Sequence, residues 1–305
     1  MENKSKKIEL TLNNIIWSKG PLRNEYSKKD TDYPSSSIDI KNIINSVTKE
    51  NNIVFIRNGT GDHVKDLEYF ADHINLLKIP IILITSDGDK SMMLSQDTRH
   101  INKILKSDMI IKWYTQNYDK SIIHPKLTHI PIGFDLHTQR WFVNNSMSDK
   151  IKYMLYKRSL SQPDKRISNR VLSDTHNSIT HYERIRLFET LKENKSIDFV
   201  NNRISFEEIT DLYNKYNFVL SPRGNGLDCH RTWELFLAGA IVITKTSCLD
   251  DMFIKHNLPV VILKDWDELN ENIENKLKDW YKEYIGKTSI NNIFPRLTFD
   301  YWLKT

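Results

Sequence analysis

The segment Ser221–Glu234, which reads SPRGNGLDCHRTWE, carries the residues of this chain best suited to binding a phosphate. Its two glycines, Gly224 and Gly226, permit close backbone approach and positive φ angles. An apolar run before the segment predicts a strand, and the residues after the glycines predict a helix that begins near Cys229. The free N–H groups and the positive dipole end of such a helix favour a phosphate.

Two charged residues in the predicted helix extend this site. Arg231 lies in the first turn, where its guanidinium can make a bidentate contact with a diphosphate. Glu234 follows three residues later on the same helix face, so its carboxylate can accept hydrogen bonds from ribose hydroxyls. The alternative is a plain strand–turn–helix connection with a solvated arginine and glutamate. The combination of glycines, helix end, arginine and glutamate favours a nucleotide-diphosphate site over that alternative.

Short apolar runs alternate with helix-like segments along both halves of the sequence. Because apolar strands separated by helices are typical of parallel sheets covered on both faces, we expect an α/β fold with Rossmann-like domains. A capping box of Ser205 and Glu208 opens one predicted helix. The predicted strands are 53–57, 79–85, 109–114, 127–132, 169–172, 197–200, 218–221, 240–244 and 260–263. The predicted helices are 66–77, 101–106, 181–194, 205–216, 229–238 and 267–284.

The bulk composition narrows the class of protein only slightly. The net charge of +5 and the pI near 8.9 suit anionic ligands such as nucleotide diphosphates, but also nucleic acid or acidic membranes. The two cysteines, Cys229 and Cys248, imply no disulfide framework, and we interpret Cys229 as a packing or spacing residue. No apolar run approaches the roughly 20 residues of a membrane-spanning helix, so we expect a soluble, cytoplasmic protein without a signal peptide.

The stretch SPRGNGLDCHRTWELFLAGAIVI resembles the donor-site signature of exostosin-like glycosyltransferases, and the following LPVVILKDWDEL is similar to the strand and helix after that signature. In the first half, TSDGD, WYTQNYD and HIPIGFDLHT are similar to segments of small exostosin-like proteins encoded by algae and large DNA viruses. The resemblance implies a GT-B fold, with two facing Rossmann-like domains and the active site in the cleft. By resemblance, the donor site is lined by Arg223, Gly224, Asn225, Gly226, Asp228, His230, Arg231 and Glu234.

The resemblance also implies the reaction and the division of the chain. It implies inverting transfer of a sugar from a UDP-sugar, with UDP-xylose as one plausible donor, to a saccharide or glycoprotein acceptor. No cofactor or essential divalent metal is implied, and no metal-binding residues are expected. We expect an acceptor-side N-terminal domain at 1–145 and a nucleotide-sugar-binding domain at 146–285, with the polar stretch 144–165 connecting them. The segment 286–305 is expected to form a helix that packs back on the N-terminal domain through three aromatic residues, Phe299, Tyr301 and Trp302.

Inverting transfer needs a general base that deprotonates the acceptor hydroxyl. We expect this base in a loop at the carboxyl edge of the first domain, and we favour a carboxylate, Asp62 or Asp87. The three candidate bases are Asp62, Asp87 and Asp135, and the further acceptor-side candidates are His63, Asp89 and His137. The SDGD segment that holds two of these residues also fits a different interpretation, because Asp-x-Asp after a strand binds a divalent cation in GT-A enzymes.

Two other functions remain open at this level. The excess of lysine is compatible with a glycosyltransferase that modifies nucleic acid, where lysines would neutralise phosphates. A non-catalytic module that binds a nucleotide or a sugar would need the same phosphate site. A dehydrogenase is disfavoured, because the first predicted strand is followed by RNGTGDH instead of the GxGxxG pattern.

Overall fold

The computed structural model describes residues 14–19, 36–58, 64–136, 147–174 and 181–304 of the 305-residue chain. The chain divides by its contacts into two compact units. The smaller unit consists of Ile16–Ile132 together with the short segment Gly226–Asp228. The larger unit consists of Met1–Ile15, Gly133–Asn225 and Cys229–Thr305. The expected domain boundary at residues 145 and 146 lies outside the described residues.

The smaller unit is built on a four-stranded sheet in the order β1-β2-β3-β4, with every neighbouring pair parallel. This confirms the predicted alternation of strands and helices, to which the structure adds a helix before the first strand. The strands are β1 (Ile53–Arg57), β2 (Ile81–Ser86), β3 (Ile110–Thr115) and β4 (Leu127–His129). The helices are α2 (Ser37–Asn45), α3 (Asp66–His73), the short 3-10 helix η2 (Ile74–Leu76) and α4 (Thr98–Lys106).

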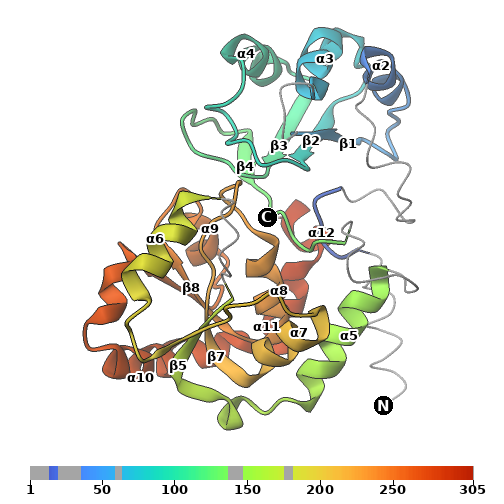
Figure 1. The fold of residues 1–305 in the computed structure, drawn as a ribbon. Helices are drawn as coiled ribbons and strands as arrows, with labels where there is room; N and C mark the ends of the chain where they lie inside the picture. The colour runs from blue at the N-terminus through green and yellow to red at the C-terminus, as the bar shows by residue number, and fades with distance from the viewer. Residues whose placement is uncertain (1–13, 20–35, 59–63, 137–146, 175–180, 305) are drawn as a thin grey trace, which may run out of the picture. The chain divides into compact units, whose positions relative to one another are not determined.

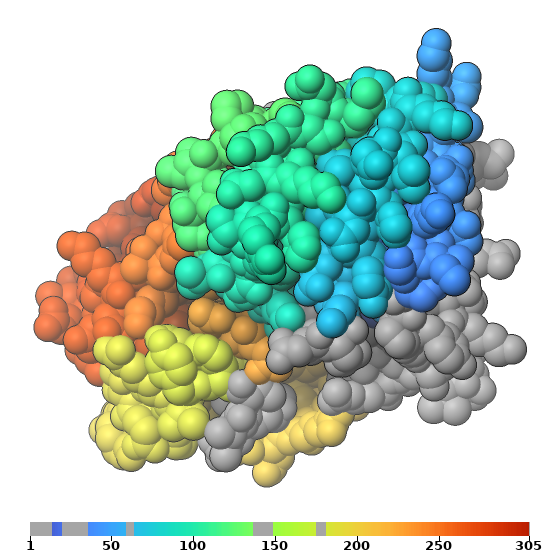
Figure 2. All heavy atoms as spheres, turned by 90° about the horizontal axis from the view of Figure 1, so that it is seen from above, coloured from blue at the N-terminus to red at the C-terminus, as the bar shows by residue number. Residues whose placement is uncertain are grey.

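One layer of helices covers this sheet, with α2, α3 and α4 side by side (Figure 1). Their apolar side chains, including the fully buried Phe70, Ile101 and Ile104, pack against strand residues such as Trp113. In the space-filling view, the side chains of these helices form the continuous blue-to-teal surface of the unit (Figure 2). The carboxyl ends of the parallel strands therefore meet at one edge of a well-packed sheet.

The larger unit contains a five-stranded parallel sheet in the order β6-β5-β7-β8-β9. The chain order reverses between β5 and β7, because β6 pairs on one side of β5 and β7 on the other. The two parallel sheets confirm the predicted α/β class, and the facing arrangement with a cleft stays a prediction. The strands are β5 (Ile167–Ser173), β6 (Ile197–Phe199), β7 (Tyr216–Leu220), β8 (Ile241–Lys245) and β9 (Val260–Leu263).

Helices cover both faces of this sheet (Figure 1). On one face, Leu187, Trp266 and Leu277 pack against the strands, whereas α7 and α8 contact β7 and β8 from the other side. The α-helices are α5 (Met147–Leu160), α6 (Tyr182–Leu191), α7 (Phe206–Lys215), α8 (His230–Ala238), α9 (Asp250–Lys255), α10 (Ile273–Tyr284), α11 (Ile290–Ile293) and α12 (Phe299–Leu303). The 3-10 helices are η4 (Pro163–Lys165), η5 (Trp266–Asn270), η6 (Ile285–Thr288) and η7 (Phe294–Leu297).

Three local expectations can be compared directly with these elements. The capping box of Ser205 and Glu208 at the start of α7 is confirmed. The predicted helix 267–284 is split into η5 and α10, because Asn272 adopts a left-handed conformation between them. Most of the polar stretch 144–165 forms the 14-residue helix α5, and its role as the connection between the domains stays a prediction. The apolar residues of α5 form no clear stripe, although Ile151 and Met154 are buried.

The C-terminal segment forms a series of short helices instead of a single one. The Trp302 ring lies 4.2 Å from the His256 ring and 5.9 Å from the Trp233 ring, measured between centroids. Tyr301 also contacts His256, and both rings therefore pack within the larger unit. At its start, α12 is joined to the beginning of the chain, since Phe299 N donates to Asn14 O at 3.0 Å. Packing of this segment on the N-terminal domain stays a prediction.

In the parts of the chain that the structure describes, none of the helices combines the length and the apolar character that crossing a membrane requires.

Candidate functional site

The SPRGNG segment connects β7 to α8, as the sequence predicts. The helix begins at His230, and Cys229 precedes it in an extended conformation without a side-chain capping hydrogen bond. The Ser221 and Thr232 hydroxyls lie 2.8 Å apart and join the end of the strand to the first helical turn. Within the loop, Gly224 N donates to Cys229 Sγ at 2.9 Å. The loop therefore has a defined conformation that leaves the first amides of α8 uncapped by the residue before them.

This loop lies at the point where the chain order of the larger sheet reverses. Asp174 directly follows β5, and Ser221 directly follows the neighbouring strand β7. In open α/β sheets, ligands bind beyond the carboxyl ends of the strands at such a reversal. The fold thus brings the predicted phosphate-binding residues to the edge where a ligand is expected.

Arg231 is anchored at this edge by Asp174. Its Nε lies 2.8 Å from Asp174 Oδ1 and 2.9 Å from Oδ2, and the Tyr213 hydroxyl donates to the same carboxylate. Burial, the largest single influence, acts to lower the pKa of Arg231, but the charge of Asp174 together with the contributions of Tyr213 and Cys229 raises the pKa above its usual value. The Nη1 atom of Arg231 is buried and has no hydrogen-bond partner among the described residues. The guanidinium is therefore a fixed cation with one donor group unused.

The sequence suggests that Glu234 binds ribose, but in the structure its side chain pairs with a residue of the protein. Its Oε1 forms an ion pair with Lys150 of α5, which is only 2% exposed. Lys150 Nζ also donates to Asp135 O at 2.9 Å and lies 5.4 Å from the centroid of the Phe206 ring. This buried lysine fixes the position of the Glu234 carboxylate, and its ribose contact stays a prediction.

The two ends of α8 are stabilised differently. At the C-terminal end, Gly239 adopts the left-handed conformation, with φ at 83°. Arg158 Nη1 donates to Leu237 O at 2.7 Å, and Arg166 Nη2 donates to Ala238 O at 2.8 Å. Burial lowers the pKa of both arginines to about 10. Two guanidinium groups therefore satisfy the negative end of the helix dipole, whereas the residue before its positive end, Cys229, provides no side-chain cap.

The expectation of positive φ angles at the loop glycines is wrong. Among the described glycines, only Gly133 and Gly239 have positive φ. Gly224 and Gly226 instead leave space for neighbouring side chains. A Cβ on Gly224 would lie 3.0 Å from Arg184 Nη2, and a Cβ on Gly226 would lie 3.1 Å from Asn117 Nδ2. The expected close approach to the two glycines is thus present, and the groups that approach them are the side chains of Arg184 and Asn117.

Three further predicted donor-site residues make contacts within their own units. Asp228 is 4% exposed, its N–H donates to Asn117 Oδ1 at 2.9 Å, and its Oδ2 accepts from Ile132 N at 2.7 Å. His230 Nδ1 lies 2.8 Å from Gly133 O. Arg223 Nη2 donates to Asn225 O at 3.1 Å, which shapes the loop itself. Contact of these residues with a donor stays a prediction.

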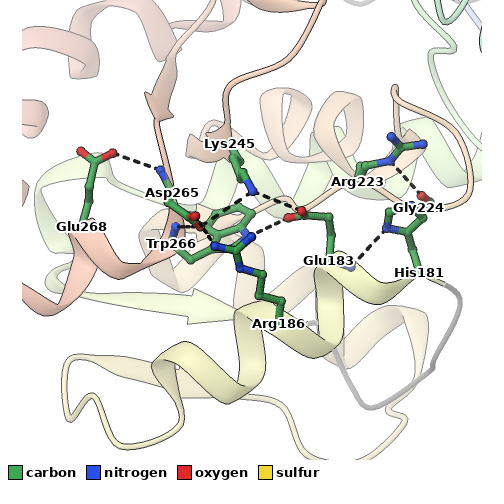
Figure 3. Close-up of polar contacts among 9 residues, drawn as sticks. All are labelled: His181, Glu183, Arg186, Arg223, Gly224, Lys245, Asp265, Trp266 and Glu268. Carbon is green, nitrogen blue, oxygen red and sulfur yellow. Dashed lines mark hydrogen bonds and ion pairs between the residues drawn. The ribbon is translucent and has the colours of Figure 1, made fainter.

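The first turn of α6 also lies at this edge, which the sequence analysis did not recognise (Figure 3). Buried Glu183 accepts from Lys245 Nζ at 3.2 Å, at the end of β8, and from Trp266 Nε1 at 3.1 Å. One residue further along the helix, Arg184 Nε donates to Arg223 O at 3.3 Å. The helix itself was predicted. Because α6 follows the first strand of the larger parallel sheet, its first turn has to start at the carboxyl edge. This rule could have predicted the location of Glu183 and Arg184.

The base candidates differ in how their carboxylates are used. Both oxygens of Asp87 bind the Lys19 ammonium, at 2.9 and 3.0 Å, and the residue has a positive φ of 62°. Asp89 is partly buried and forms no hydrogen bond or ion pair with any other described residue. Asp135 belongs to the larger unit, where its carbonyl accepts from Lys150. The candidates Asp62, His63 and His137 lie outside the described residues.

The loop that carries Asp87 and Asp89 is held firmly at the carboxyl edge of the smaller sheet. Gly88 O accepts from Gln116 Nε2 at 2.8 Å and from Asn117 Nδ2 at 2.9 Å. The Asp87 N–H donates to Gln116 Oε1 at 3.0 Å, and Asn58 Nδ2 donates to Lys90 O at 3.1 Å. Side-chain amides thus fix the backbone on both sides of Asp89. Across the described ranges, no group of three or more His, Cys, Asp or Glu residues is arranged to hold a metal ion.

Comparisons with known proteins give little further information. No protein-family model and no curated protein matches the sequence. Among solved structures, the chain is similar to WaaG, a glycosyltransferase involved in lipopolysaccharide biosynthesis. The alignment covers 86% of this chain and 94% of WaaG, with 12% sequence identity and a TM-score of 0.37. Because this similarity is too weak to carry a function, the fold assignment rests on the two parallel sheets themselves.

Proposed function

We propose that this chain is a glycosyltransferase that moves a sugar from a UDP-sugar to a saccharide or glycoprotein acceptor. We also propose that the transfer inverts the anomeric centre and needs no divalent metal. One observation carries the proposal. The first turn of α8 starts at the reversal point of a parallel sheet, next to a buried arginine whose Nη1 has no partner in the described part of the chain. UDP-xylose is one donor to be tested among several.

The chemistry of the leaving group fits this edge of the sheet. When the bond between the anomeric carbon and the diphosphate oxygen breaks, negative charge accumulates on the departing UDP. Arg231, whose pKa is raised by Asp174, stays cationic throughout this step. Fixed cations and helix N-termini stabilise such charge without reorganising, and removing one such donor typically costs about 3–4 kcal/mol in the transition state.

We place the general base on the smaller unit, and among its described candidates we favour Asp89. In the proposed step, Asp89 takes the proton of an acceptor hydroxyl as the oxygen attacks the anomeric carbon and UDP departs. Asp87 is less available for this role because the Lys19 ammonium contacts both of its oxygens. A loop whose backbone is fixed by Gln116 and Asn117 can hold such a base in one position.

A screen of nucleotide sugars by UDP release, with and without saccharide acceptors, tests this proposal. We expect one UDP-sugar to be consumed, the product to have inverted anomeric configuration by NMR, and the rate to be unchanged by EDTA. Absence of both turnover and UDP binding would contradict the proposal. UDP binding without consumption of any donor would favour a non-catalytic binding module. Binding of duplex DNA or RNA that weakens steeply with salt would favour a nucleic-acid acceptor.

A further inference from the structure

Arg184 lies in the first turn of α6, and its guanidinium rests on the backbone of the SPRGNG loop. Its Nε donates to Arg223 O at 3.3 Å. Its Nη2 lies 3.0 Å from the position that a Cβ on Gly224 would occupy, and the guanidinium carbon lies 3.8 Å from that position. A side chain at residue 224 would therefore be crowded against this guanidinium, which would have to shift by a few tenths of an ångström. The missing side chain of Gly224 leaves room for the Arg184 guanidinium.

Positive charge gathers around this space. Three arginines, Arg184, Arg223 and Arg231, and the carboxylate of Asp174 lie at the SPRGNG loop and the adjacent carboxyl edge of the sheet. We call this region the loop edge. Burial, followed by the charge of Arg231, lowers the pKa of Arg184, while Cys229 and the Asp174 carboxylate offset part of this effect. Holding this guanidinium beside a second one has an electrostatic cost. A bound anion would offset that cost.

Two independent features at the same edge also point to an anion. The first turn of α8 begins directly after Cys229, whose Sγ lies 3.6 Å from the Gly224 Cβ position, and Cys229 provides no side-chain cap for this turn. The Nη1 group of Arg231 is buried and finds no hydrogen-bond acceptor within the described ranges. Uncapped helix amides and an unused guanidinium donor are groups that phosphate oxygens satisfy.

We propose that Arg184 is a phosphate-binding residue that grips the diphosphate of the nucleotide donor together with the first turn of α8. Glycine at residue 224 leaves the space beside its Cα to the guanidinium of Arg184. This inference rests on the proposed nucleotide site, and it adds a residue from a helix outside the SPRGNG segment. Arg184 contributes to the binding of the phosphate groups and not to the binding of the nucleoside.

Isothermal titration calorimetry of the full chain with UDP, uridine and inorganic pyrophosphate tests this role. We expect Arg184→Met to weaken UDP and pyrophosphate binding at least 10-fold and to leave uridine binding within about twofold. Arg184→Lys keeps the charge and should recover part of the loss. The control is Arg186→Met on the same helix, an exposed arginine that pairs with Asp265, and it should bind all three ligands like the wild type.

A matched pair of glycine variants tests the shared space. Gly224→Ala should displace the Arg184 guanidinium and weaken UDP and pyrophosphate binding at least fivefold. Gly286→Ala adds the same methyl group where no atom lies within 4 Å, and it should leave binding unchanged. Thermal melts of all variants establish that they are folded before their affinities are compared.

The outcomes separate this inference from the proposed function. Wild-type affinity of Arg184→Met for both UDP and pyrophosphate would overturn the role of Arg184 while leaving the glycosyltransferase proposal standing. Equal losses for uridine and UDP would also overturn it, because they would indicate a structural role. If pyrophosphate binds and depends on Arg184 but UDP binds no more tightly than pyrophosphate, the phosphate site stands and the nucleotide donor is wrong.

Discussion

The two ends of α8 show how one helix can have a structural end and a ligand-binding end. At the C-terminal end, Arg158 and Arg166 donate to the last carbonyls, so the negative end of the dipole is satisfied within the protein. At the N-terminal end, Cys229 provides no side-chain cap, and the charge of Arg231 in the first turn acts on the nearby Arg184. Cations at a helix C-terminus stabilise the fold, whereas cations at the N-terminus add to the positive end of the dipole. The second arrangement costs stability unless an anion binds there.

Among the changes that test the difference between the two ends of α8, Arg231→Met should have the largest effect. The change removes a cation from the ligand end and leaves the buried Asp174 carboxylate with the Tyr213 hydroxyl but without the charge of Arg231. We expect transfer to fall at least about 1000-fold and the free energy of unfolding to fall by about 3–5 kcal/mol. UDP-release rates and urea unfolding measure the two effects. Arg231→Lys, which keeps the charge but loses the planar fork, should be better folded and still slow.

Asp89→Asn should remove the general base of the transfer step without changing the contacts at either end of α8. We expect kcat to fall by about 100-fold or more, with the Kd for UDP unchanged in calorimetry. Asp87→Asn provides the comparison, because Asp87 already contacts Lys19, and it should reduce kcat much less. The assignment would be wrong if Asp87→Asn had the larger effect or if Asp89→Asn lost UDP affinity.

Arg166→Met tests the structural end of α8. Without this side chain, the carbonyls of Ala238 and Gly239 lose their donors, which should lower the free energy of unfolding by about 1–3 kcal/mol. Urea unfolding measures this loss. The Kd for UDP should stay within about twofold of the wild-type value at a temperature where the variant is folded. A loss of UDP affinity as large as that of Arg231→Met would remove the distinction between the two ends.

The smallest effect concerns His256, which packs against α12 away from the loop edge. Burial, followed by the charge of Lys255, lowers the pKa of His256 to about 4 from a usual value of 6.5. The unfolded chain therefore takes up the proton first as the pH falls. This uptake should lower the free energy of unfolding between pH 6.5 and pH 4, by at most about 1.4 kcal/mol per pH unit.

His256→Gln isolates this contribution. Urea unfolding at several pH values should give a flatter pH dependence for the variant than for the wild type below pH 6.5. The same variant should leave UDP binding at pH 7.5 unchanged. Identical slopes for the two proteins would mean that another group controls acid stability.

Local patterns in the sequence predicted the elements well, because apolar runs and turn residues act over a few positions. The start of α8 near Cys229 and the capping box of α7 are examples. Partners distant in sequence had no such signal. The contacts of Arg231 with Asp174 and of Glu234 with Lys150 join residues separated by 57 and 84 positions. The helix α5 was missed because its apolar residues form no clear stripe, and the roles of the two glycines depend on side chains from other elements.

A crystal structure of the chain with UDP tests the central claim most directly. The account predicts diphosphate density at the first turn of α8, with phosphate oxygens within hydrogen-bond distance of Arg184 and of Arg231 Nη1. Density for the diphosphate anywhere else, or none at saturating UDP, would contradict it.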